Sequence, residues 1–301
     1  MLFDSYGKYI FYDGAMGTML YKYGLRRGDK PDLMNLTAPE IVEKIHRMYI
    51  EAGSDIILTN TFGSNAFNLR ETGYSPKEVI TAAVANAARA CRSVQNDVAR
   101  VAGSQSTGQQ STKTAISLDI GPIGELIEPY GNLEYNTAYD MFKEMAVAGE
   151  NAGVDFVSLE TMSDLTEVKA AMSAVSDNTK LPILVTMTFE KSGRTFMGCS
   201  PESFVETAQA LGAAALGINC SLEPVEMLEI AEHIASLTKL PLIIKPNAGL
   251  PDEGIYNTDA VDFAEQMSKF KKLNPKIIGG CCGTTPEYIK ELKTVFSQSG
   301  K

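Results

Sequence analysis

The segment DFVSLETMSDLTEVKAAMSAVSD, residues 155–177, shows how the chain is built. Its first six residues, 155–160, form a short apolar run of the kind found in a buried parallel strand. Asp164 then precedes an amphipathic stretch, 164–177, and is placed to cap a helix at its N-terminus. The segment is therefore predicted to be one strand–turn–helix unit.

The same unit recurs along the whole chain. Eight short runs, most of them apolar on both faces, are predicted as strands: 9–13, 55–60, 114–119, 155–160, 183–188, 214–219, 242–247 and 276–280. Amphipathic stretches separate them, and alternating strands and helices predict a parallel sheet. Eight units in 301 residues predict an α/β chain folded as a single (β/α)8 TIM barrel. A doubly wound open sheet is the alternative.

The predicted helices carry their own end signals. Ser75 and Asp164 are expected N-caps, and Gly53 and Gly153 are expected to end two helices. The polar segment 103–112, GSQSTGQQST, is expected to be a flexible surface loop on the face away from the active site. Because no linker is visible elsewhere, we expect one domain over residues 1–301.

Composition narrows the classes of function. The net charge is -10 and no dense Lys/Arg cluster is present, which argues against nucleic-acid binding. No apolar run approaches the ~20 residues of a membrane span, and the first residues, MLFDSYGKYIFYDG, lack signal-peptide features. We therefore expect a cytoplasmic protein. Since that compartment keeps thiols reduced, clustered cysteines there favour metal binding or catalysis over disulfides.

Polar residues end nearly every predicted strand, where a barrel carries its chemistry. The strand ends are Asp13, Asn60, Asp119, Glu160, Thr188, Asn219-Cys220, Asn247 and Cys281-Cys282. Turn preferences explain Asp and Asn there, but not cysteines after the sixth and eighth strands. Because only one strand separates those two, Cys220, Cys281 and Cys282 can converge on one point.

Three converging thiolates suit zinc, with a fourth position left open as in catalytic sites. Spacing alone leaves other interpretations, namely cysteines that only pack in the core or a vicinal disulfide between Cys281 and Cys282. Cys199 could add a ligand, whereas Cys91 lies in a predicted helix and is expected to pack.

The two histidines do not fit a catalytic role. His46 and His233 both fall within predicted helices, away from the strand ends. Serine and cysteine hydrolases usually need a histidine base, and common zinc hydrolases need histidine ligands. Neither class is therefore expected.

Six motifs, in chain order, resemble the homocysteine S-methyltransferase family. They are DGAMGTML (13–20), LTNTFGSN (58–65), LETMSDL (159–165), GINCSLEP (217–224), KPNAGLP (245–251) and GGCCGTTPEYI (279–289). The chain looks most like the homocysteine-binding domain of cobalamin-dependent methionine synthase, over essentially its whole length. The resemblance implies a (β/α)8 barrel that methylates homocysteine in methionine biosynthesis, with one Zn²⁺ per chain held by Cys220, Cys281 and Cys282.

The resemblance also implies the substrate contacts. Asp13 and Glu160 would face the amino group of homocysteine, as charge-assisted hydrogen-bond acceptors. The backbone of Gly14, Ala15 and Met16 would cradle the substrate carboxylate. From the residues alone, Asp13 could merely begin a turn and Glu160 could lie on a solvated rim.

The mechanism expected from this resemblance is thiolate attack on a methyl group. A zinc ion with three cysteine thiolates and the homocysteine thiolate has a formal charge of about -2, which keeps the bound sulfur electron-rich. The loops SLEPVE (221–226) and GTTPEY (283–288) lead directly into helices, so no long lid is expected. An open rim favours methylcobalamin, carried by a separate corrinoid protein, as donor. A small donor, S-methylmethionine or betaine, is one alternative. The other is that the chain is an isolated fragment of a longer protein.

Two other functions stay open. Lys245, between apolar residues of the seventh strand, could have a lowered pKa and form a Schiff base. A non-catalytic zinc barrel could instead dock a partner protein, with a fourth protein ligand such as Cys199 closing the zinc site.

Overall fold

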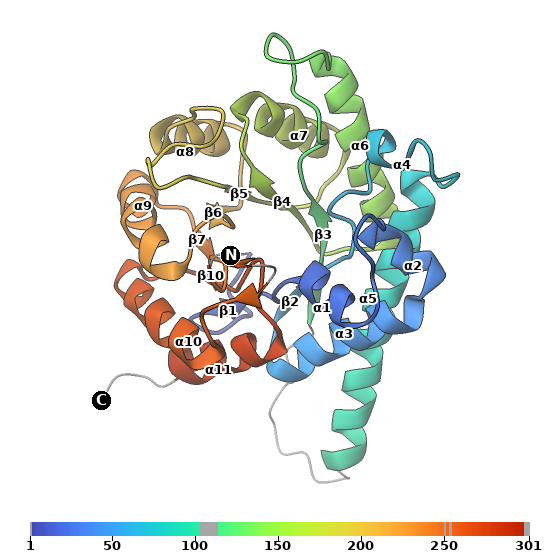
Figure 1. Ribbon diagram of the computed structural model, residues 1–301, viewed down its shortest axis with the longest axis vertical. Coiled ribbons are helices and arrows are strands. Elements are labelled where there is room, and N and C mark those ends of the chain that lie inside the picture. The colour runs from blue at the N-terminus through green and yellow to red at the C-terminus, as the bar shows by residue number, and fades with distance from the viewer. Residues whose placement is uncertain (1, 103–113, 250, 253–254, 298–301) are drawn as a thin grey trace.

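Eight parallel strands form the centre of the molecule (Figure 1). The computed structural model describes residues 2–102, 114–249, 251–252 and 255–297; the segment 103–112 lies outside them. The strands are β1 (Ile10–Phe11), β2 (Ile56–Leu58), β3 (Ala115–Ile120), β4 (Phe156–Met162), β5 (Ile183–Met187), β6 (Ala215–Asn219), β7 (Leu242–Lys245) and β10 (Ile277–Ile278). Each coincides with a predicted strand.

The strand order shows a barrel rather than an open sheet. Neighbours pair in the order β1-β10-β7-β6-β5-β4-β3-β2, all in parallel. A parallel bridge between Tyr12 and Ile56 then joins the two ends of this order. The predicted (β/α)8 TIM barrel is therefore confirmed, and the doubly wound alternative is wrong.

Helices surround the strands on the outside (Figure 1). The helix that follows each strand around the ring is, in turn, α3 (Pro39–Ala52), α5 (Pro76–Ala102), α6 (Tyr135–Ala152), α7 (Leu165–Asn178), α8 (Pro201–Ala210), α9 (Pro224–Leu237), α10 (Ala260–Ser268) and α11 (Pro286–Ser297). Shorter pieces are α1 (Met16–Lys22), α2 (Met34–Thr37), α4 (Ala66–Leu69) and the 3₁₀ turns Pro31–Leu33 and Lys269–Leu273. A small antiparallel hairpin, β8 (Pro251–Asp252) with β9 (Ile255–Tyr256), follows β7.

The end signals work as the sequence indicates. The Asp164 side chain accepts a hydrogen bond from the Thr166 N–H (2.8 Å) at the start of α7. Ser75 and Glu78 bond reciprocally at the start of α5, as a capping box. Gly53 and Gly153 end α3 and α6 in the left-handed conformation, with φ of 108° and 92°.

The barrel interior holds an apolar plug below a polar layer. Phe3 stacks on Phe156 (ring centroids 6.2 Å apart), within a cluster of inward-facing residues from the strands. Above it, the Tyr12 hydroxyl bonds the Ser158 hydroxyl (2.7 Å), which bonds Ser117 in turn (2.7 Å). Among the described residues, no helix has the length and apolar character that a membrane crossing requires.

Candidate metal centre and active site

Three cysteines meet at the carboxyl ends of the strands. Cys220 directly follows β6, and Cys281 and Cys282 follow β10; β7 lies between these two strands. Their Sγ atoms all lie within 4.8 Å of one another, and those of Cys220 and Cys282 are 3.9 Å apart. All five cysteines of the chain are free thiols. The convergence is as predicted, and the vicinal disulfide is not formed.

The backbone around the cluster explains its unusual sequence. Cys220 and Ser221 both have positive φ, 61° and 57°, a conformation that costs non-glycine residues about 1–3 kcal/mol each. A Cβ on Gly279 would lie 2.7 Å from the Tyr12 Cβ, and one on Gly280 would overlap Thr284. The glycine pair therefore lets the chain pass close to its neighbours and brings both following cysteines to the rim.

The spacing of the thiols fits zinc. A tetrahedral zinc with Zn–S bonds of ~2.3 Å places its sulfur ligands about 3.8 Å apart, and the Cys220–Cys282 separation is 3.9 Å. Cys199 is not in this group, and its thiol donates to the Ser200 carbonyl (3.4 Å). The described residues thus supply three thiol ligands with no fourth cysteine beside them.

The thiols are also prepared to bind a cation. Hydrogen bonds from the Cys220 and Cys281 thiols lower the pKa of Cys282 to about 3, and the Tyr256 hydroxyl adds to them. Contact with Cys220 and Cys282, together with burial, raises the pKa of Cys281 well above its ordinary value. A divalent cation beside these sulfurs would favour the ionised form of the thiols.

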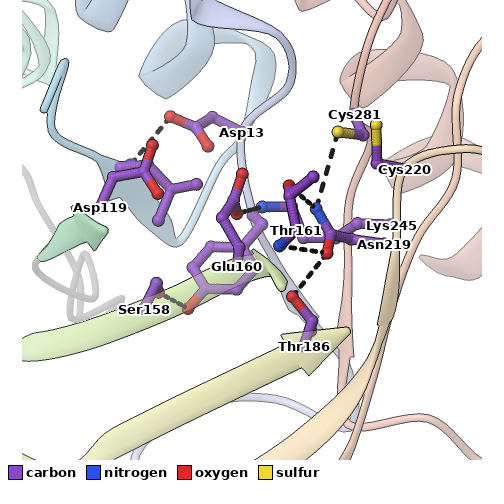
Figure 2. Close-up of polar contacts among 12 residues, drawn as sticks. Asp13, Asp119, Ser158, Glu160, Thr161, Thr186, Asn219, Cys220, Lys245 and Cys281 are labelled. Carbon is purple, nitrogen blue, oxygen red and sulfur yellow. Dashed lines mark hydrogen bonds and ion pairs between the residues drawn. The ribbon is translucent and has the colours of Figure 1, made fainter. Parts of the chain in front are cut away.

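Asn219 is a supporting residue that sequence reasoning recorded only as a strand end. Its amide nitrogen donates to the Cys281 Sγ (3.7 Å) and to the Thr161 hydroxyl (2.8 Å). Its amide oxygen accepts from the Thr161 N–H (2.8 Å) and the Thr186 hydroxyl (2.7 Å). Figure 2 shows this network holding the side chain against the cysteine sulfur. No spacing rule in the sequence signals such a contact.

The cysteines open onto a cavity of about 460 Å³. Its lining combines the thiols with acidic and basic side chains and with the start of α1. The lining includes Gly14, Ala15, Met16, Asp32, Asp119, Glu160, Lys245, Cys220, Cys281 and Cys282. All the predicted site residues except Asp13 therefore border one space.

Asp13 is buried beside this cavity rather than on its surface. The residue is 1% exposed, and its Oδ2 accepts from the Leu58 N–H (2.9 Å). Burial raises the pKa of its carboxyl to about 7, although Lys245 opposes the rise. Asp13 thus does more than begin a turn, because its side chain ties the segment after β1 to the backbone at the end of β2.

Glu160 forms a buried ion pair with Lys245 (Figure 2). The side chains are 11% and 3% exposed, so Glu160 does not lie on a solvated rim. Burial disfavours the Lys245 charge, but Glu160, Cys281 and Asp13 outweigh it and hold the pKa of the ammonium above its ordinary value. A Schiff-base nucleophile needs the opposite shift, so the geometry opposes that alternative.

One residue of the backbone predicted to cradle the substrate carboxylate already has its N–H in use. The Ala15 N–H already donates to the Thr284 carbonyl (3.0 Å), which leaves Gly14 and Met16 for this role. The histidines lie as predicted: His46 is buried in α3, and His233 pairs with Glu202 (2.6 Å) on the outer surface of the barrel.

The rim loops differ from the expectation of short connections. The loops after β6 and β10 are short, but those after β3 (121–134), β5 (188–200) and β7 (246–259) are long. The β8–β9 hairpin brings Tyr256 against Cys282. The expectation was wrong because the short loops after β6 and β10 are not typical of the whole rim. Exposed aromatic side chains lie on two of these loops, namely Tyr130 (71%) after β3 and Phe196 (76%) after β5, and Phe62 (41%) lies on the loop after β2.

Comparison with known proteins places the chain in a family. Residues 10–296 match the family model described as homocysteine S-methyltransferase. The chain is 31% identical to methionine synthase of Mycobacterium leprae over 302 residues, which cover 95% of this chain and 24% of that protein. Methionine synthase of Mycobacterium tuberculosis is 30% identical over 296 residues, with coverage of 93% and 24%. The chain thus spans about a quarter of the length of these relatives.

Solved structures show the same fold. The homocysteine methyltransferase MmuM from Escherichia coli matches in its oxidized form with a TM-score of 0.80 at 21% identity, over 96% of each chain. Its metallated form matches with a TM-score of 0.80 at 22% identity, over 98% of this chain and 99% of that one. With its motifs, its barrel and the family model in agreement, the chain belongs to the homocysteine S-methyltransferase family.

Proposed function

We propose that this chain transfers a methyl group to the thiol of homocysteine, giving methionine, with one Zn²⁺ bound by Cys220, Cys281 and Cys282. The observation that carries the proposal is the position of the three thiols. They meet at a spacing that suits zinc, on the wall of a cavity that also holds Glu160 and lies beside Asp13. Zinc, when bound, would supply the Lewis acidity that keeps a thiol ionised near neutral pH.

The chain's own residues would position the reacting sulfur. Cys220, Cys281 and Cys282 would hold the ion, and because they line the cavity, the substrate thiol could reach it from there. Asn219 holds Cys281 through its amide nitrogen (3.7 Å). The homocysteine sulfur would then attack the methyl carbon; the new S–C bond forms as the bond from that carbon to the donor breaks.

The amino-acid end of homocysteine would lie at the acidic side of the cavity. We assign its ammonium to Asp13 and Glu160, which accept charge-assisted hydrogen bonds. Met16, the first residue of α1, would receive the carboxylate, because the first N–H groups of a helix have no partner within it, and Gly14 would add the N–H just ahead of the N-cap residue Ala15. Ala15 only shapes this turn, since its N–H is already bonded.

For the methyl donor we propose methylcobalamin on a separate corrinoid protein. The relatives named methionine synthase are about four times as long as the matched region, which leaves room in them for further domains. Exposed aromatic side chains such as Phe62, Tyr130 and Phe196 on the rim loops would suit a protein partner.

A small donor such as S-methylmethionine or betaine is the alternative. The long loops 121–134 and 188–200, together with the hairpin next to Cys282, favour it because they could enclose a small molecule. A zinc barrel that only docks a partner has less support, since Cys199 is absent from the thiol cluster. A cytoplasmic location stays a prediction.

A methyl-transfer assay tests the proposal. Zinc-loaded protein is incubated with homocysteine and, separately, with free methylcobalamin, corrinoid-protein-bound methylcobalamin, S-methylmethionine and betaine, and methionine is measured by mass spectrometry. The Cys281→Ala variant is the control for zinc-dependent turnover. We expect turnover with the corrinoid donor. Turnover with a small donor alone would reverse the choice of donor, and none with any donor would contradict the proposed activity.

A further inference from the structure

Two sulfurs of the cysteine cluster receive hydrogen bonds from the segment at the end of β6. The Asn219 amide nitrogen donates to the Cys281 Sγ (3.7 Å), as Figure 2 shows. The Ser221 N–H donates to the Cys220 Sγ. The positive φ angles of Cys220 and Ser221 lie in this same segment. The unusual backbone there thus serves the sulfurs with donors as well as bringing one of them to the rim.

The third sulfur receives its donor from the β8–β9 hairpin. The Tyr256 hydroxyl donates to the Cys282 Sγ. The ring of Tyr256 also packs onto the backbone next to that cysteine, because a Cβ on Gly283 would lie 2.3 Å from the ring carbon Cγ. A glycine at position 283 therefore makes room for the tyrosine beside Cys282.

The hairpin is anchored by contacts that do not use the Tyr256 hydroxyl. The Ala248 N–H donates to the Cys282 carbonyl (2.9 Å), and the Thr258 N–H donates to the Ala248 carbonyl (3.3 Å). From α11, the Tyr288 hydroxyl donates to the Thr258 carbonyl (2.6 Å). Because these bonds hold the hairpin in place, the hydroxyl of Tyr256 is left to act on the sulfur.

The three donors approach the sulfurs from outside the cavity. The three cysteines line the cavity, whereas Asn219, Ser221 and Tyr256 are not among the described residues that border it. A thiol that enters through the cavity therefore meets the cluster from a side that these donors do not occupy. The donors serve the protein's own sulfurs and not the incoming one.

This arrangement bears on which sulfur receives the methyl group. Under the proposed function the centre holds four sulfurs, three from the protein and one from homocysteine, and each is a thiolate able to attack a methyl carbon. A hydrogen bond to a thiolate stabilises its charge, and the nucleophilicity of a thiolate falls as its affinity for a proton falls. A thiolate with a dedicated donor is therefore the weaker nucleophile.

We propose that the Tyr256 hydroxyl protects Cys282 from methylation, and that Asn219 and the Ser221 N–H protect the other two cysteines in the same way. The homocysteine sulfur meets none of these three donors and is then the preferred nucleophile. Tyr256 is thus a residue that decides which sulfur reacts, and it acts through Cys282. The inference rests on the proposed function, because it takes methyl transfer at this centre as given.

The test uses iodomethane as a methyl probe on the zinc-loaded protein, after metal analysis has shown that parent and variant hold equal zinc. At a thiolate, the new S–C bond forms as the C–I bond breaks, and iodide leaves with the electron pair. Peptide mass spectrometry then gives the rate of methylation at each cysteine separately. No corrinoid protein or enzymatic turnover is needed for this measurement.

The informative variant is Tyr256→Phe, which keeps the ring and removes only the hydroxyl. A hydrogen bond to a charged group corresponds to about 10- to 150-fold in the stability of the ion. The reactivity of a thiolate follows about half of this on a logarithmic scale. We therefore expect methylation of Cys282 to be about 3- to 12-fold faster in the variant, with the rates at Cys220 and Cys281 unchanged.

The control variant is Tyr288→Phe, which removes a hydroxyl from the same hairpin contact but not from a sulfur. It should methylate all three cysteines at the parent's rates. Three results would overturn the proposal: an unchanged rate at Cys282 in Tyr256→Phe, faster reaction at all three cysteines in that variant, or equal acceleration of Cys282 in Tyr288→Phe. The last two would mean that a loosened hairpin, rather than a lost hydrogen bond, controls reactivity.

The unmodified protein gives a second measurement that does not depend on any variant folding. With homocysteine present at one equivalent, iodomethane should methylate homocysteine faster than Cys220, Cys281 or Cys282. If these cysteines react as fast as homocysteine, the protection is wrong although zinc-dependent methyl transfer can stand. If the protein binds no zinc, the proposed function fails and the inference with it.

Discussion

The Lys245–Glu160 pair allows a quantitative test of how the site is held. Lys245→Met removes the ammonium but keeps a side chain of similar length. The Glu160 side chain, which is 11% exposed, is then buried without the Lys245 cation. Glu160→Gln has the converse effect, because it leaves the Lys245 ammonium, at 3% exposure, without the Glu160 carboxylate. Breaking one partner of a buried pair costs about 3–5 kcal/mol, because the remaining charge is uncompensated.

The double variant separates this effect from loss of packing. With both charges of the pair removed, neither of its two members is left as an unpaired buried ion, so Lys245→Met/Glu160→Gln should cost no more than either single change. If the two changes were independent, their costs would add. We therefore expect a coupling energy of about 3 kcal/mol or more between the two positions.

Urea unfolding at pH 7 measures these costs. For a slope of about 3 kcal/mol per M, each single change should lower the midpoint by about 1 to 1.7 M, with the slope unchanged. Single changes that each cost under about 1 kcal/mol and add in the double variant would refute the account, because surface pairs behave in that way.

Two further predictions concern the metal centre and the pH dependence of folding. Cys281→Ala should lose zinc and activity together, since two thiolates hold zinc poorly. Cys199→Ala should keep its zinc in a metal analysis. Zinc retained by Cys281→Ala, or lost from Cys199→Ala, would contradict the assigned ligand set. The Glu167 carboxyl accepts from the Ile123 N–H (2.7 Å), and burial raises its pKa from 4.5 to about 7. The folded state holds that proton after the unfolded state has released it, so this residue's contribution to stability is greatest below pH 4.5 and falls by about 3 kcal/mol as pH rises to about 7. Urea midpoints across this range should fall less steeply in Glu167→Gln, and identical slopes in parent and variant would contradict the assignment.

Much of the fold was predictable because strands and helices leave local signals. The run 242–247 shows both the strength and the limit of such signals: β7 begins at Leu242 as expected but ends at Lys245. Pro246 follows, and it lacks the N–H that would continue the ladder. The cysteine convergence was predictable because strand order alone brings the ends of β6 and β10 near each other.

Side-chain pairing could not be predicted in the same way. Lys245 and Glu160 are 85 residues apart, and no local pattern indicates that they meet inside the barrel. Asp119 looked like any strand-end aspartate, because its distinguishing feature, a side-chain oxygen with no hydrogen-bond partner among the described residues, is revealed only by the three-dimensional structure. The rim differs from the expectation because the loops after β6 and β10 are shorter than those after β3, β5 and β7.

The central claim is that three cysteines bind a zinc ion whose fourth position takes the substrate sulfur. Zinc K-edge X-ray absorption on the zinc-loaded protein, before and after homocysteine is added, measures this directly. We expect three sulfur neighbours at about 2.3 Å before addition and four after it. Four sulfurs from the outset, or a spectrum that homocysteine leaves unchanged, would contradict the account.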